Sequence, residues 1–535
     1  MACYENRVTP KTPRPWLDQY NKGIPASLGL PSASMIDLFE ATARHKPAAP
    51  GLYYFDDPIS WAQLDHKANQ FAALLADWGV GHGDRVALSL QNDPDFVIAQ
   101  YGVWKRGAIV VPLSPMFKGK EIAYQLKDCG AQVYICRDEI FESQANQVLG
   151  GTDIRHVLLT GEFDKAISRY RPDEHHRLSV TPDDIAYLVY TSGTTGFPKG
   201  SISLHRNIAF NADVFRTWYS VGEDDVILGA APLFHITGIV AQMALSALAG
   251  VPLILYYRFD PGETLRLIEK WKATFAVAVI TAWIALLKEA EGREVDIRCL
   301  NKCGSGGAPT APALVDEFQR RFGVLIHNTY GLTESNSPSH LTPMGRRGPV
   351  DPASGALAIG LPVPNCDAQV VDLSDPSRCL EPGEAGELAL KGPMMFPGYW
   401  QKGEATAAAH CDGWFLTGDV AVMDREGWFY LVDRKKDMII CSGFKVWPRE
   451  VEDVLYQHPA VREAAVIGVP DGYRGETVKA VIALRQGHES LHPEEIIEFC
   501  KSRLASYKYP RQVEFMDEIP KTASGKFLRR QLRDR

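Results

Sequence analysis

The sequence contains no apolar stretch of 18 or more residues, so no segment is expected to cross a membrane as a helix. Its first residues, MACYENRVTPKTPRPW, lack the apolar core of a secretory signal peptide, and RRQLRDR at the end matches no simple C-terminal address, so a cytoplasmic protein is expected. Positive charge is not in excess either: 57 lysines and arginines stand against 65 aspartates and glutamates, a net charge of −8. No nucleic-acid partner is therefore expected, because binding a phosphate backbone requires clustered positive charge.

Cysteine is sparse and unpatterned, with 10 residues in a chain of 535. Cys299 and Cys303 stand close together, but no second Cys or His pair follows at zinc spacing, so free thiols in a reducing cytoplasm are expected. The run Asp173-Glu174-His175-His176 contains metal-ligand residue types. It lies in a polar, proline-flanked stretch and is interpreted as a solvated linker.

The length predicts two or more domains, because a single hydrophobic core rarely serves so many residues. Helix and strand patterns alternate: a capping box at Ser60 and Gln63 opens a helix that ends near Gly79, and strands at 86–90 and 108–113 flank a helix at 96–105. Repeats of this kind predict an α/β protein, with layered βα subdomains and mostly parallel sheets in a large N-terminal domain, residues 1–433. After the charge run at 433–437, residues 437–535 are expected to form a small α+β domain.

The stretch YTSGTTGFPKG, residues 190–200, follows an apolar run that is typical of a buried strand. Its hydroxyl donors are Thr191, Ser192, Thr194 and Thr195. Glycines there let backbone N–H groups approach a ligand closely, and Lys199 adds positive charge, so the loop suits phosphate oxygens. A P-loop is excluded, since Pro198 stands five residues after Gly193, where that motif requires Gly. Taken alone, the stretch fits a surface turn equally well.

Six further stretches decide between these interpretations. They are PLFHITG at 232–238, GSGGAP at 304–309, YGLTE at 330–334, TGD at 417–419, DRKKDMIICSG at 433–443 and PKTASGK at 520–526. Together with residues 190–200, and in this order, they resemble the motifs of the adenylate-forming superfamily. That superfamily includes acyl-CoA synthetases, peptide-synthetase adenylation domains and beetle luciferases. The chain is most similar to its fatty-acid and aryl-acid coenzyme A ligases.

The resemblance implies an ATP-dependent acid–CoA ligase. A carboxylate attacks the α-phosphate of ATP, giving acyl-AMP and pyrophosphate, and the thiol of coenzyme A then attacks the acyl carbon and expels AMP. Two anions meet in the first step, so fixed positive charge, N–H donors and Mg²⁺ are expected around the phosphates. The resemblance implies ATP and Mg²⁺ as cofactors and coenzyme A as a co-substrate. A monomer or a homodimer is expected.

The motif positions also assign residues to the nucleotide. The β- and γ-phosphates would be held by Thr191, Ser192, Gly193, Thr194, Thr195 and Lys199. The adenine would lie against Gly307, Ala308, Pro309, Gly331 and the ring of Tyr330. Asp419 would accept hydrogen bonds from the ribose hydroxyls, Thr333 would contact the α-phosphate, and Arg434 would reach the ribose or the phosphates. Glu334 would hold Mg²⁺.

Lys526 would bridge the substrate carboxylate and the α-phosphate, a transient contact that suits a flexible point charge. With Thr191, Glu334 and His235 it forms the predicted catalytic set. The resemblance further implies that the C-terminal domain rotates about Lys436, within a hinge at 434–436, because Lys526 must leave before the thiol can enter. Taken singly, a lysine near a C-terminus or an acid in a turn is usually a solvated charge, and only the ordered motif set favours these roles.

The PLFHITG motif at 232–238 indicates which kind of carboxylic acid the enzyme would activate. Phe234-His235-Ile236 lacks the Asp that peptide-synthetase domains usually carry for their substrate's amino group, so an α-amino acid is not expected. His235 resembles the gate between acyl pocket and thiol channel, although a core histidine at the start of a helix at 238–248 is the alternative. The pocket walls would be Ile236, Ile239, Val240, Thr281, Ala282, Gly304, Ser305, Gly306, Asn328 and Gly331. These small or apolar residues predict a fatty, aryl or alicyclic tail.

Gly443 and Lys445 would lie on the coenzyme A side, although Lys445 could simply be solvated. Two alternatives remain open at this point. The first is an adenylating enzyme that loads a carrier protein, or that oxidises its adenylate as luciferases do. The second is a non-catalytic ligand-binding homologue, against which the presence of Lys526, Glu334 and Asp419 argues.

Overall fold

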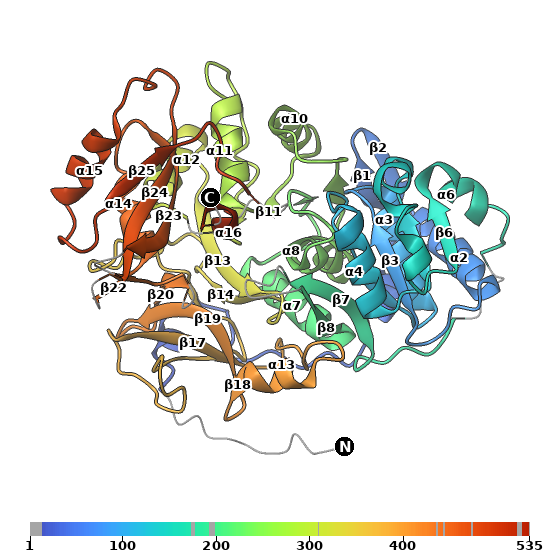
Figure 1. Ribbon diagram of the computed structural model, residues 1–535. Coiled ribbons are helices and arrows are strands. Elements are labelled where there is room, and N and C mark those ends of the chain that lie inside the picture. Colours follow the sequence, from blue (N-terminus) through green and yellow to red (C-terminus); the bar gives the residue numbers. More distant parts are fainter. Residues whose placement is uncertain are drawn as a thin grey trace.

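The computed structural model describes residues 13–172, 177–191, 198–308, 310–434, 437–441, 444–471, 475–521 and 527–533. Only the backbone is described for Asp433, Arg434, Phe444, Lys445, Gly475 and Arg530. The described strands form four β-sheets with helices packed around them (Figure 1). The fold is therefore α/β, as the alternation of helix and strand patterns predicts.

One sheet has six strands in the order β6-β5-β3-β4-β7-β8. These strands are β3 (Arg85–Ser89), β4 (Ile109–Pro112), β5 (Val133–Cys136), β6 (His156–Leu159), β7 (Ile185–Thr191) and β8 (Lys199–Leu204). All neighbours are parallel except β7 and β8, which form an antiparallel pair. Its helices are α2 (Trp61–Asp77), α3 (Pro94–Lys105), α4 (Gly119–Cys129) and α6 (Thr160–Ile167). Every residue of β4 and β5 is buried, as expected for parallel strands covered on both faces.

Local signals at the helix ends explain where these helices begin. The predicted capping box is present, with Ser60 capping α2 and the Gln63 side chain accepting from the Ser60 N–H. The helix predicted at 96–105 begins two residues earlier, at Pro94, because the Asp93 side chain caps it and proline suits the first helical position.

The second sheet has nine strands in the order β15-β14-β13-β12-β11-β9-β10-β1-β2. They are β1 (Pro50–Tyr54), β2 (Asp57–Ser60), β9 (Ile227–Leu228), β10 (Leu253–Leu255), β11 (Phe275–Ala278), β12 (Lys302–Ser305), β13 (Ile326–Leu332), β14 (Ser337–Leu341) and β15 (Leu361–Pro362). The strands from β13 to β1 are parallel, and β2, β14 and β15 are antiparallel additions at the edges.

Two apolar cores flank this sheet. One contains side chains of α1 (Met35–His45), α2, α3 and α7 (His205–Trp218). The other packs α10 (Pro261–Trp271), α11 (Ile280–Glu289) and α12 (Pro312–Phe322) onto strands such as β9, β10 and β11. The helix predicted at 238–248 is longer and is not uniform: α8 (Ile236–Gly238) continues into the π-helical η4 (Ile239–Ala244) and then α9 (Leu245–Ala249).

The third sheet is antiparallel throughout, which the expectation of mostly parallel sheets did not anticipate. Its strands are β16 (Asp367–Val371), β17 (Ala385–Lys391), β18 (His410–Cys411), β19 (Trp414–Met423) and β20 (Phe429–Arg434), with α13 (Gly403–Ala408) beside them. For β19 and β20 the physical reason is the short connection: only residues 424–428 separate them, and parallel pairing would require a crossover of a dozen residues or more.

The chain after residue 437 builds a sheet of its own in the order β22-β21-β24-β23, with β25 paired to β24. Its strands are β21 (Ile439–Cys441), β22 (Phe444–Val446), β23 (Val461–Asp471), β24 (Gly475–Leu484) and β25 (Gln512–Phe515). Its helices are α14 (Pro448–Leu455), α15 (Pro493–Lys501) and α16 (Arg529–Arg533). A separate apolar core lies within this region. The boundary at 434–436 and the rotation about it remain predictions.

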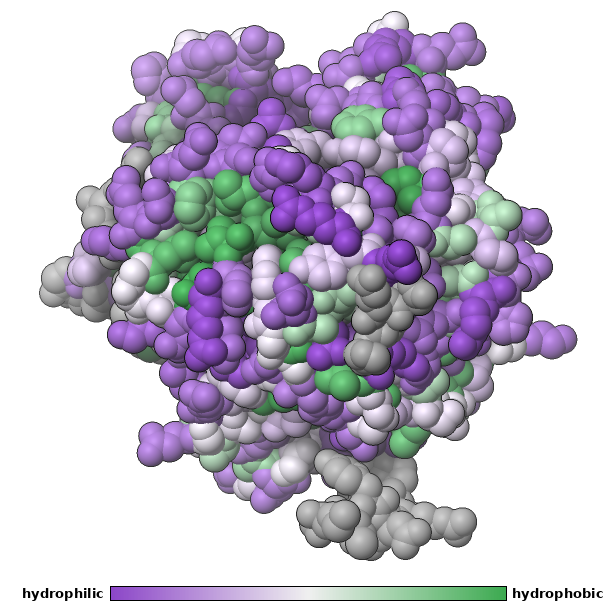
Figure 2. All heavy atoms as spheres, turned by 90° about the vertical axis from the view of Figure 1, so that its right-hand side faces the viewer, coloured by the Kyte–Doolittle hydropathy of each residue, from purple (hydrophilic) through white to green (hydrophobic). Residues whose placement is uncertain are grey.

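Short helical segments complete the described chain: η1 (Pro15–Gln19), α5 (Asp138–Ile140), η2 (Phe141–Ala145) and η3 (Leu149–Gly151). The face in Figure 2, on the side of the six-stranded sheet, is mostly hydrophilic, with a large contiguous hydrophobic patch and smaller hydrophobic areas. None of the helices in the described ranges has both the length and the apolar character needed to cross a bilayer.

Candidate active site

Several predicted pocket residues lie together at the carboxyl ends of β11, β12 and β13. Ser305 pairs with Ala278 of β11 on one side and with Asn328 of β13 on the other. Thr281 and Ala282 follow in the first turn of α11, directly after β11. The carboxyl ends of adjacent parallel strands are the usual place for a ligand in an α/β sheet. The structure therefore brings these residues to one edge of the nine-stranded sheet.

Two of the predicted pocket glycines are needed for close packing of the chain itself. A Cβ atom on Gly304 would lie 3.0 Å from the hydroxyl oxygens of Thr329 and Tyr219. A Cβ atom on Gly331 would lie 2.1 Å from the Ser337 carbonyl oxygen, where the β13–β14 register shifts. These glycines are thus explained by the fold, and their contact with a ligand remains a prediction.

The helical wall of the predicted pocket comes from α8 and η4. His235 is half-buried and caps α8, with its Nδ1 accepting the Thr237 N–H at 3.4 Å. Ile236, Ile239 and Val240 are buried. Their burial fits a wall that faces an apolar tail and fits a core position equally. The π-helical turn at this point is a feature often found at functional sites.

The residues predicted for the adenine and the ribose are in direct contact. The Tyr330 hydroxyl donates to Oδ2 of Asp419 at 2.7 Å. Both residues are buried, with exposed fractions of 8% for Tyr330 and 6% for Asp419. Tyr330 belongs to β13 and Asp419 to β19, so the hydrogen bond joins the nine-stranded sheet to the antiparallel sheet. The backbone of Arg434 lies opposite Asp419 in the β19–β20 pair. Three predicted nucleotide residues therefore converge from three strands.

Glu334 is held by a tyrosine that the sequence reasoning missed. The Tyr399 hydroxyl donates to Oε1 of Glu334 at 2.7 Å, and the Lys199 Nζ lies 5.0 Å from the centroid of the Tyr399 ring. Burial and the negative charge of Glu334 raise the pKa of Tyr399 well above its usual value, so this hydroxyl stays a donor. The sequence offers one weak indication of this role: two adjacent aromatic residues in PGYW, residues 397–400, lie between the YGLTE and TGD motifs.

Side chains of α4 contact the residues that flank the predicted phosphate-binding loop. Thr191 pairs with Lys199 across β7 and β8, so the residues on either side of the loop lie together. The Tyr124 hydroxyl donates to the Pro198 carbonyl at 2.8 Å, and the Tyr190 hydroxyl donates to Oδ2 of Asp128 at 2.8 Å. These contacts link α4 to β7 and to the residue directly before β8.

Asn92 is a second residue that sequence reasoning missed. Its side-chain amide is buried, donates to the carbonyls of Gly229 and Ala231 at 3.3 and 2.9 Å, and accepts the Leu233 N–H at 2.9 Å. The amide thus fixes the chain that leads to His235. No local sequence pattern indicates this, because the contact joins residues 141 positions apart.

Several predicted site residues lie outside the described residues: Ser192, Gly193, Thr194, Thr195, Pro309, Lys436, Gly443 and Lys526. Arg434 and Lys445 are described by their backbone alone. The run Asp173–His176 also lies outside the described part. Gly307, Ala308 and Thr333 are described near the end of β12 and the end of β13. Cys299 and Cys303 have structural contacts, since their thiols donate to backbone carbonyls of Ile268 and Leu300.

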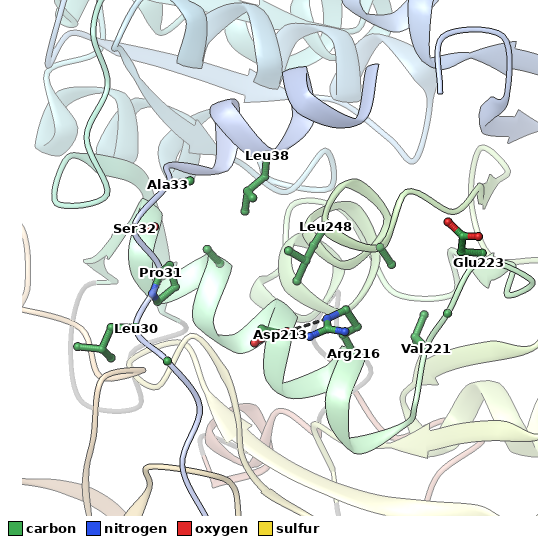
Figure 3. Close-up of a pocket in the computed structure, with 14 residues that line it drawn as sticks. Leu30, Pro31, Ser32, Ala33, Leu38, Asp213, Arg216, Val221, Glu223 and Leu248 are labelled. Atoms are coloured by element: carbon green, nitrogen blue, oxygen red, sulfur yellow. Dashed lines mark hydrogen bonds and ion pairs between the residues drawn. The ribbon is translucent and has the colours of Figure 1, made fainter. Parts of the chain in front are cut away.

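Within the described ranges no group of three or more His, Cys, Asp or Glu side chains gathers as a metal site. The single carboxylate of Glu334 still fits Mg²⁺, because this ion typically binds one or two carboxylates and completes its shell with substrate phosphates and water. A cavity of about 620 Å³ lies elsewhere, between the segment at 29–33, α1, α7 and α9 (Figure 3). No predicted site residue lines it.

Comparison with known proteins agrees with the motif resemblance. Residues 39–400 match the AMP-binding enzyme family, and residues 450–526 match the AMP-binding enzyme C-terminal domain. The long-chain-fatty-acid–CoA ligase of Bacillus subtilis is 37% identical over 97% of both chains. The feruloyl-CoA synthase of an Amycolatopsis species is 36% identical over 92% of this chain and 97% of its own.

Solved structures are similar over almost the whole chain. A crystal structure of an anthranilate CoA ligase in complex with anthranoyl-AMP superposes with a TM-score of 0.86 at 28% identity, covering 95% of this chain and 98% of its own. The o-succinylbenzoate CoA synthetase of Bacillus subtilis, in complex with its acyl-adenylate intermediate, gives a TM-score of 0.83 at 29% identity and covers 95% and 99% of the two chains.

Proposed function

The chain belongs to the AMP-binding enzyme family, and we propose that its substrates are carboxylic acids with an apolar tail. The chain is an AMP-forming acid–CoA ligase, an acyl-CoA synthetase that uses ATP and coenzyme A. In the first half-reaction the carboxylate attacks the α-phosphate of ATP, so that acyl-AMP forms and pyrophosphate leaves. In the second, the thiol of coenzyme A attacks the acyl carbon, a thioester forms and AMP leaves.

The hydrogen bond between Tyr330 and Asp419 is the observation that carries the placement of the nucleotide. It fixes an aromatic ring and a carboxylate side by side, 2.7 Å apart at their oxygens, beside the strand ends of β12 and β13. Adenine can stack on such a ring, and ribose hydroxyls can donate to such a carboxylate. We therefore place the base near Tyr330 and the sugar near Asp419 and the Arg434 segment.

Glu334 supports a magnesium site beside the phosphates. Its carboxylate is oriented by the Tyr399 hydroxyl, and Lys199 lies close to the same ring. When bound, Mg²⁺ would neutralise phosphate oxygens and orient the pyrophosphate for departure. Thr191 and Lys199 frame the loop at 192–197, whose hydroxyls and N–H groups we assign to the β- and γ-phosphates. Lys526 supplies the cation between the substrate carboxylate and the α-phosphate.

The acyl tail is assigned to the wall formed by α8, η4 and the first turn of α11. Apolar residues there, such as Ile236, Val240 and Ala282, favour a hydrocarbon or aromatic tail over a charged one. Long-chain fatty acids are the first candidates, because relatives with that name are 32–37% identical along 97% of the chain. Aryl acids of the feruloyl kind are the second, because that relative is 36% identical.

A cytoplasmic location belongs to the same proposal. Every cysteine in the described part of the chain is a free thiol, a state that a reducing compartment maintains. Gly443 and Lys445 are assigned to the side from which coenzyme A enters. We expect a monomer or a homodimer in solution.

The proposal is tested by incubating the full chain with Mg²⁺, ATP and coenzyme A and following AMP release across fatty and aryl acids of increasing size. AMP release that needs both the acid and coenzyme A, with the matching thioester in the mass spectrum, would support the proposed substrate class. Glu334→Gln, which keeps the side-chain shape but removes the charge, should require more Mg²⁺. Glu381→Gln, an exposed acid in the turn before β17, is the control.

Two other results would contradict parts of the proposal. If acyl-AMP forms but coenzyme A is never acylated, the acceptor is a different thiol, such as that of a carrier protein. If charged or very small acids react and apolar ones do not, the assignment of the acyl wall is wrong.

A further inference from the structure

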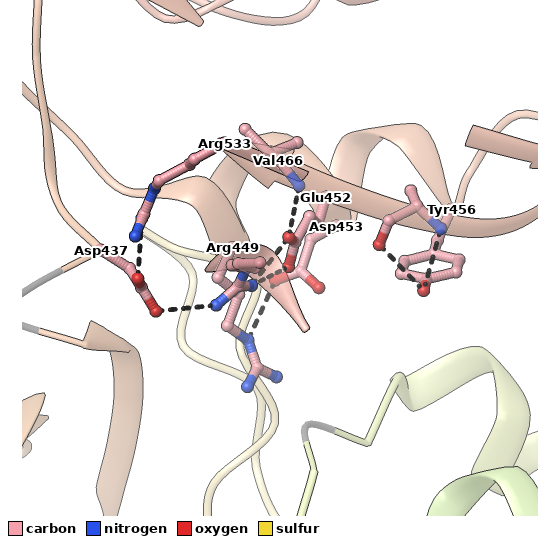
Figure 4. Close-up of polar contacts among 9 residues, drawn as sticks. Asp437, Arg449, Glu452, Asp453, Tyr456, Val466 and Arg533 are labelled. Carbon is pink, nitrogen blue, oxygen red and sulfur yellow. Dashed lines mark hydrogen bonds and ion pairs between the residues drawn. The ribbon is translucent and has the colours of Figure 1, made fainter. Parts of the chain in front are cut away.

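Four charged side chains of the C-terminal region form one connected group, here called the arginine–carboxylate cluster: Asp437, Glu452, Arg529 and Arg533. The Arg529 guanidinium donates to both oxygens of Glu452 at 2.8 and 2.9 Å and to Oδ2 of Asp437 at 3.3 Å. Arg533, one helical turn later in α16, donates to the other Asp437 oxygen at 2.7 Å. Figure 4 shows the Asp437 carboxylate facing the Arg533 side chain, with a dashed line for the bond between them.

The two acids are buried and their charges are balanced within the cluster. Asp437 is 5% exposed and Glu452 is 6% exposed, and the Arg529 side chain is 19% exposed. Glu452 also accepts the Val466 N–H at 2.7 Å, which ties the cluster to β23. Buried carboxylates are costly unless they are paired and hydrogen-bonded, so these groups hold one another in a single arrangement. The planar fork of Arg529 is what allows one cation to serve two acids.

The cluster joins two places in the chain that the reaction must coordinate. Asp437 directly follows Lys436, the residue predicted to be the pivot. Arg529 stands three residues after Lys526, at the start of α16. The residues on either side of 522–526 are themselves paired, because Lys521 and Phe527 form a β-bridge and the Leu528 N–H donates to the Pro520 carbonyl at 2.8 Å. The described residues on either side of 522–526 are therefore held together, and Arg529 links them to Asp437, the neighbour of the predicted pivot.

We infer that Arg529 is a positioning residue for adenylate formation: through Asp437 and Glu452 it holds the base of the Lys526 segment in a fixed relation to the hinge. The inference rests on the proposed function. A rotation about residues 434–436 can deliver Lys526 to the α-phosphate only if the chain between the pivot and the lysine moves as one body. Misplacement of a catalytic group by about 1 Å can cost on the order of 100-fold in rate. The thioester step does not use Lys526, so it should tolerate the same loss.

Arg529→Lys is the test variant, because it keeps the positive charge between the two acids and loses the fork that binds them together. Adenylate formation is measured as acid-dependent exchange of pyrophosphate into ATP. Thioester formation is measured separately, as AMP release from preformed acyl-AMP and coenzyme A. We expect a loss of about 10- to 100-fold in the first rate with little change in the second.

Lys479→Met is the matched control. It removes the ion pair between Lys479 and Glu514, two residues of the same C-terminal sheet. The Lys479 side chain is 16% exposed, which is similar to the exposure of Arg529. Its exchange rate should stay close to that of the unsubstituted chain. A third variant, Asp437→Asn, tests whether Arg529 acts through Asp437. Combined with Arg529→Lys it should lower the exchange rate little further, because both substitutions break the same Arg529–Asp437 contact.

The outcomes separate the inference from the function on which it rests. Unsubstituted chain that exchanges pyrophosphate, together with an Arg529→Lys variant that loses exchange selectively, would support the positioning role. An equal loss in both half-reactions, or a loss matched by Lys479→Met, would overturn it, since that is what general destabilisation produces. Exchange unchanged in Arg529→Lys would also overturn it while leaving the function intact. No acid-dependent exchange in the unsubstituted chain would overturn both.

Discussion

Tyr399→Phe should weaken the binding of Mg²⁺, and so raise the Mg²⁺ concentration that the reaction requires, while leaving the fold intact. The substitution removes one hydroxyl, which donates to Glu334 at 2.7 Å, and keeps the ring near which Lys199 lies. A hydrogen bond to a charged group contributes about 1.5–3 kcal/mol. Glu334 is half-buried, so we take the lower end, about 1.5 kcal/mol, which corresponds to about a 10-fold change in an equilibrium constant.

The assay is acid-dependent pyrophosphate exchange at fixed ATP, with Mg²⁺ varied. We expect the Mg²⁺ concentration for half-maximal rate to rise about 10-fold in Tyr399→Phe, the range seen when a residue that orients a metal ligand is removed. Tyr430→Phe is the control, because it deletes a similar bond, from the Tyr430 hydroxyl to Asp424 at 2.8 Å, within the antiparallel sheet. An unchanged Mg²⁺ curve in Tyr399→Phe, or an equal shift in the control, would refute the reasoning.

Three further predictions concern Lys526, the hinge and the carboxyl group of Asp95. Lys526→Ala should abolish adenylate formation yet still convert preformed acyl-AMP to thioester; equal loss in both steps would remove its assigned role. Lys436→Pro should slow one half-reaction far more than the other, measured in the same two assays, and equal slowing would count against the hinge. Burial and the neighbouring Asp93 charge raise the pKa of Asp95 to about 7, so its contribution to stability is full below its ordinary pKa of 3.8 and is lost as the pH rises towards 7. Asp95→Asn should therefore flatten this fall in the thermal midpoint measured against pH, and an unchanged profile would contradict the shift.

The sequence predicted those parts of the fold that depend on local signals. The capping box at Ser60 and the apolar strands at 86–90 and 108–113 are found within one residue or so of the predicted positions. The antiparallel third sheet was not predicted. The composition of a strand does not show whether it pairs in parallel or antiparallel, because that depends on how the strands are connected. The π-helical turn at Ile239–Ala244 was also missed, since it continues a helical pattern without any change in residue type.

In the candidate site, too, the residues that stand in motifs could be predicted and those that act through long-range contacts could not. Residues such as Tyr330, Glu334 and Asp419 stand in recognisable motifs, and the structure brings the first and third within 2.7 Å of each other. Tyr399 and Asn92 could not be predicted, because their roles arise from contacts across 65 and 141 positions that leave no periodic pattern.

Asn92, Tyr399 and Arg529 share one physical property that explains why the sequence did not predict their roles. Each uses a side chain to satisfy polar groups of another segment: Asn92 serves three backbone groups before His235, and Arg529 serves two buried acids. The contacts described for them are to other protein groups, so no reaction chemistry dictates their type at a fixed motif position. Yet a catalytic group acts only from the correct place, and about 1 Å of error is costly. It follows that substitutions at these positions should separate the two half-reactions or shift a binding curve, whereas loss of a motif residue such as Lys526 should remove a step outright.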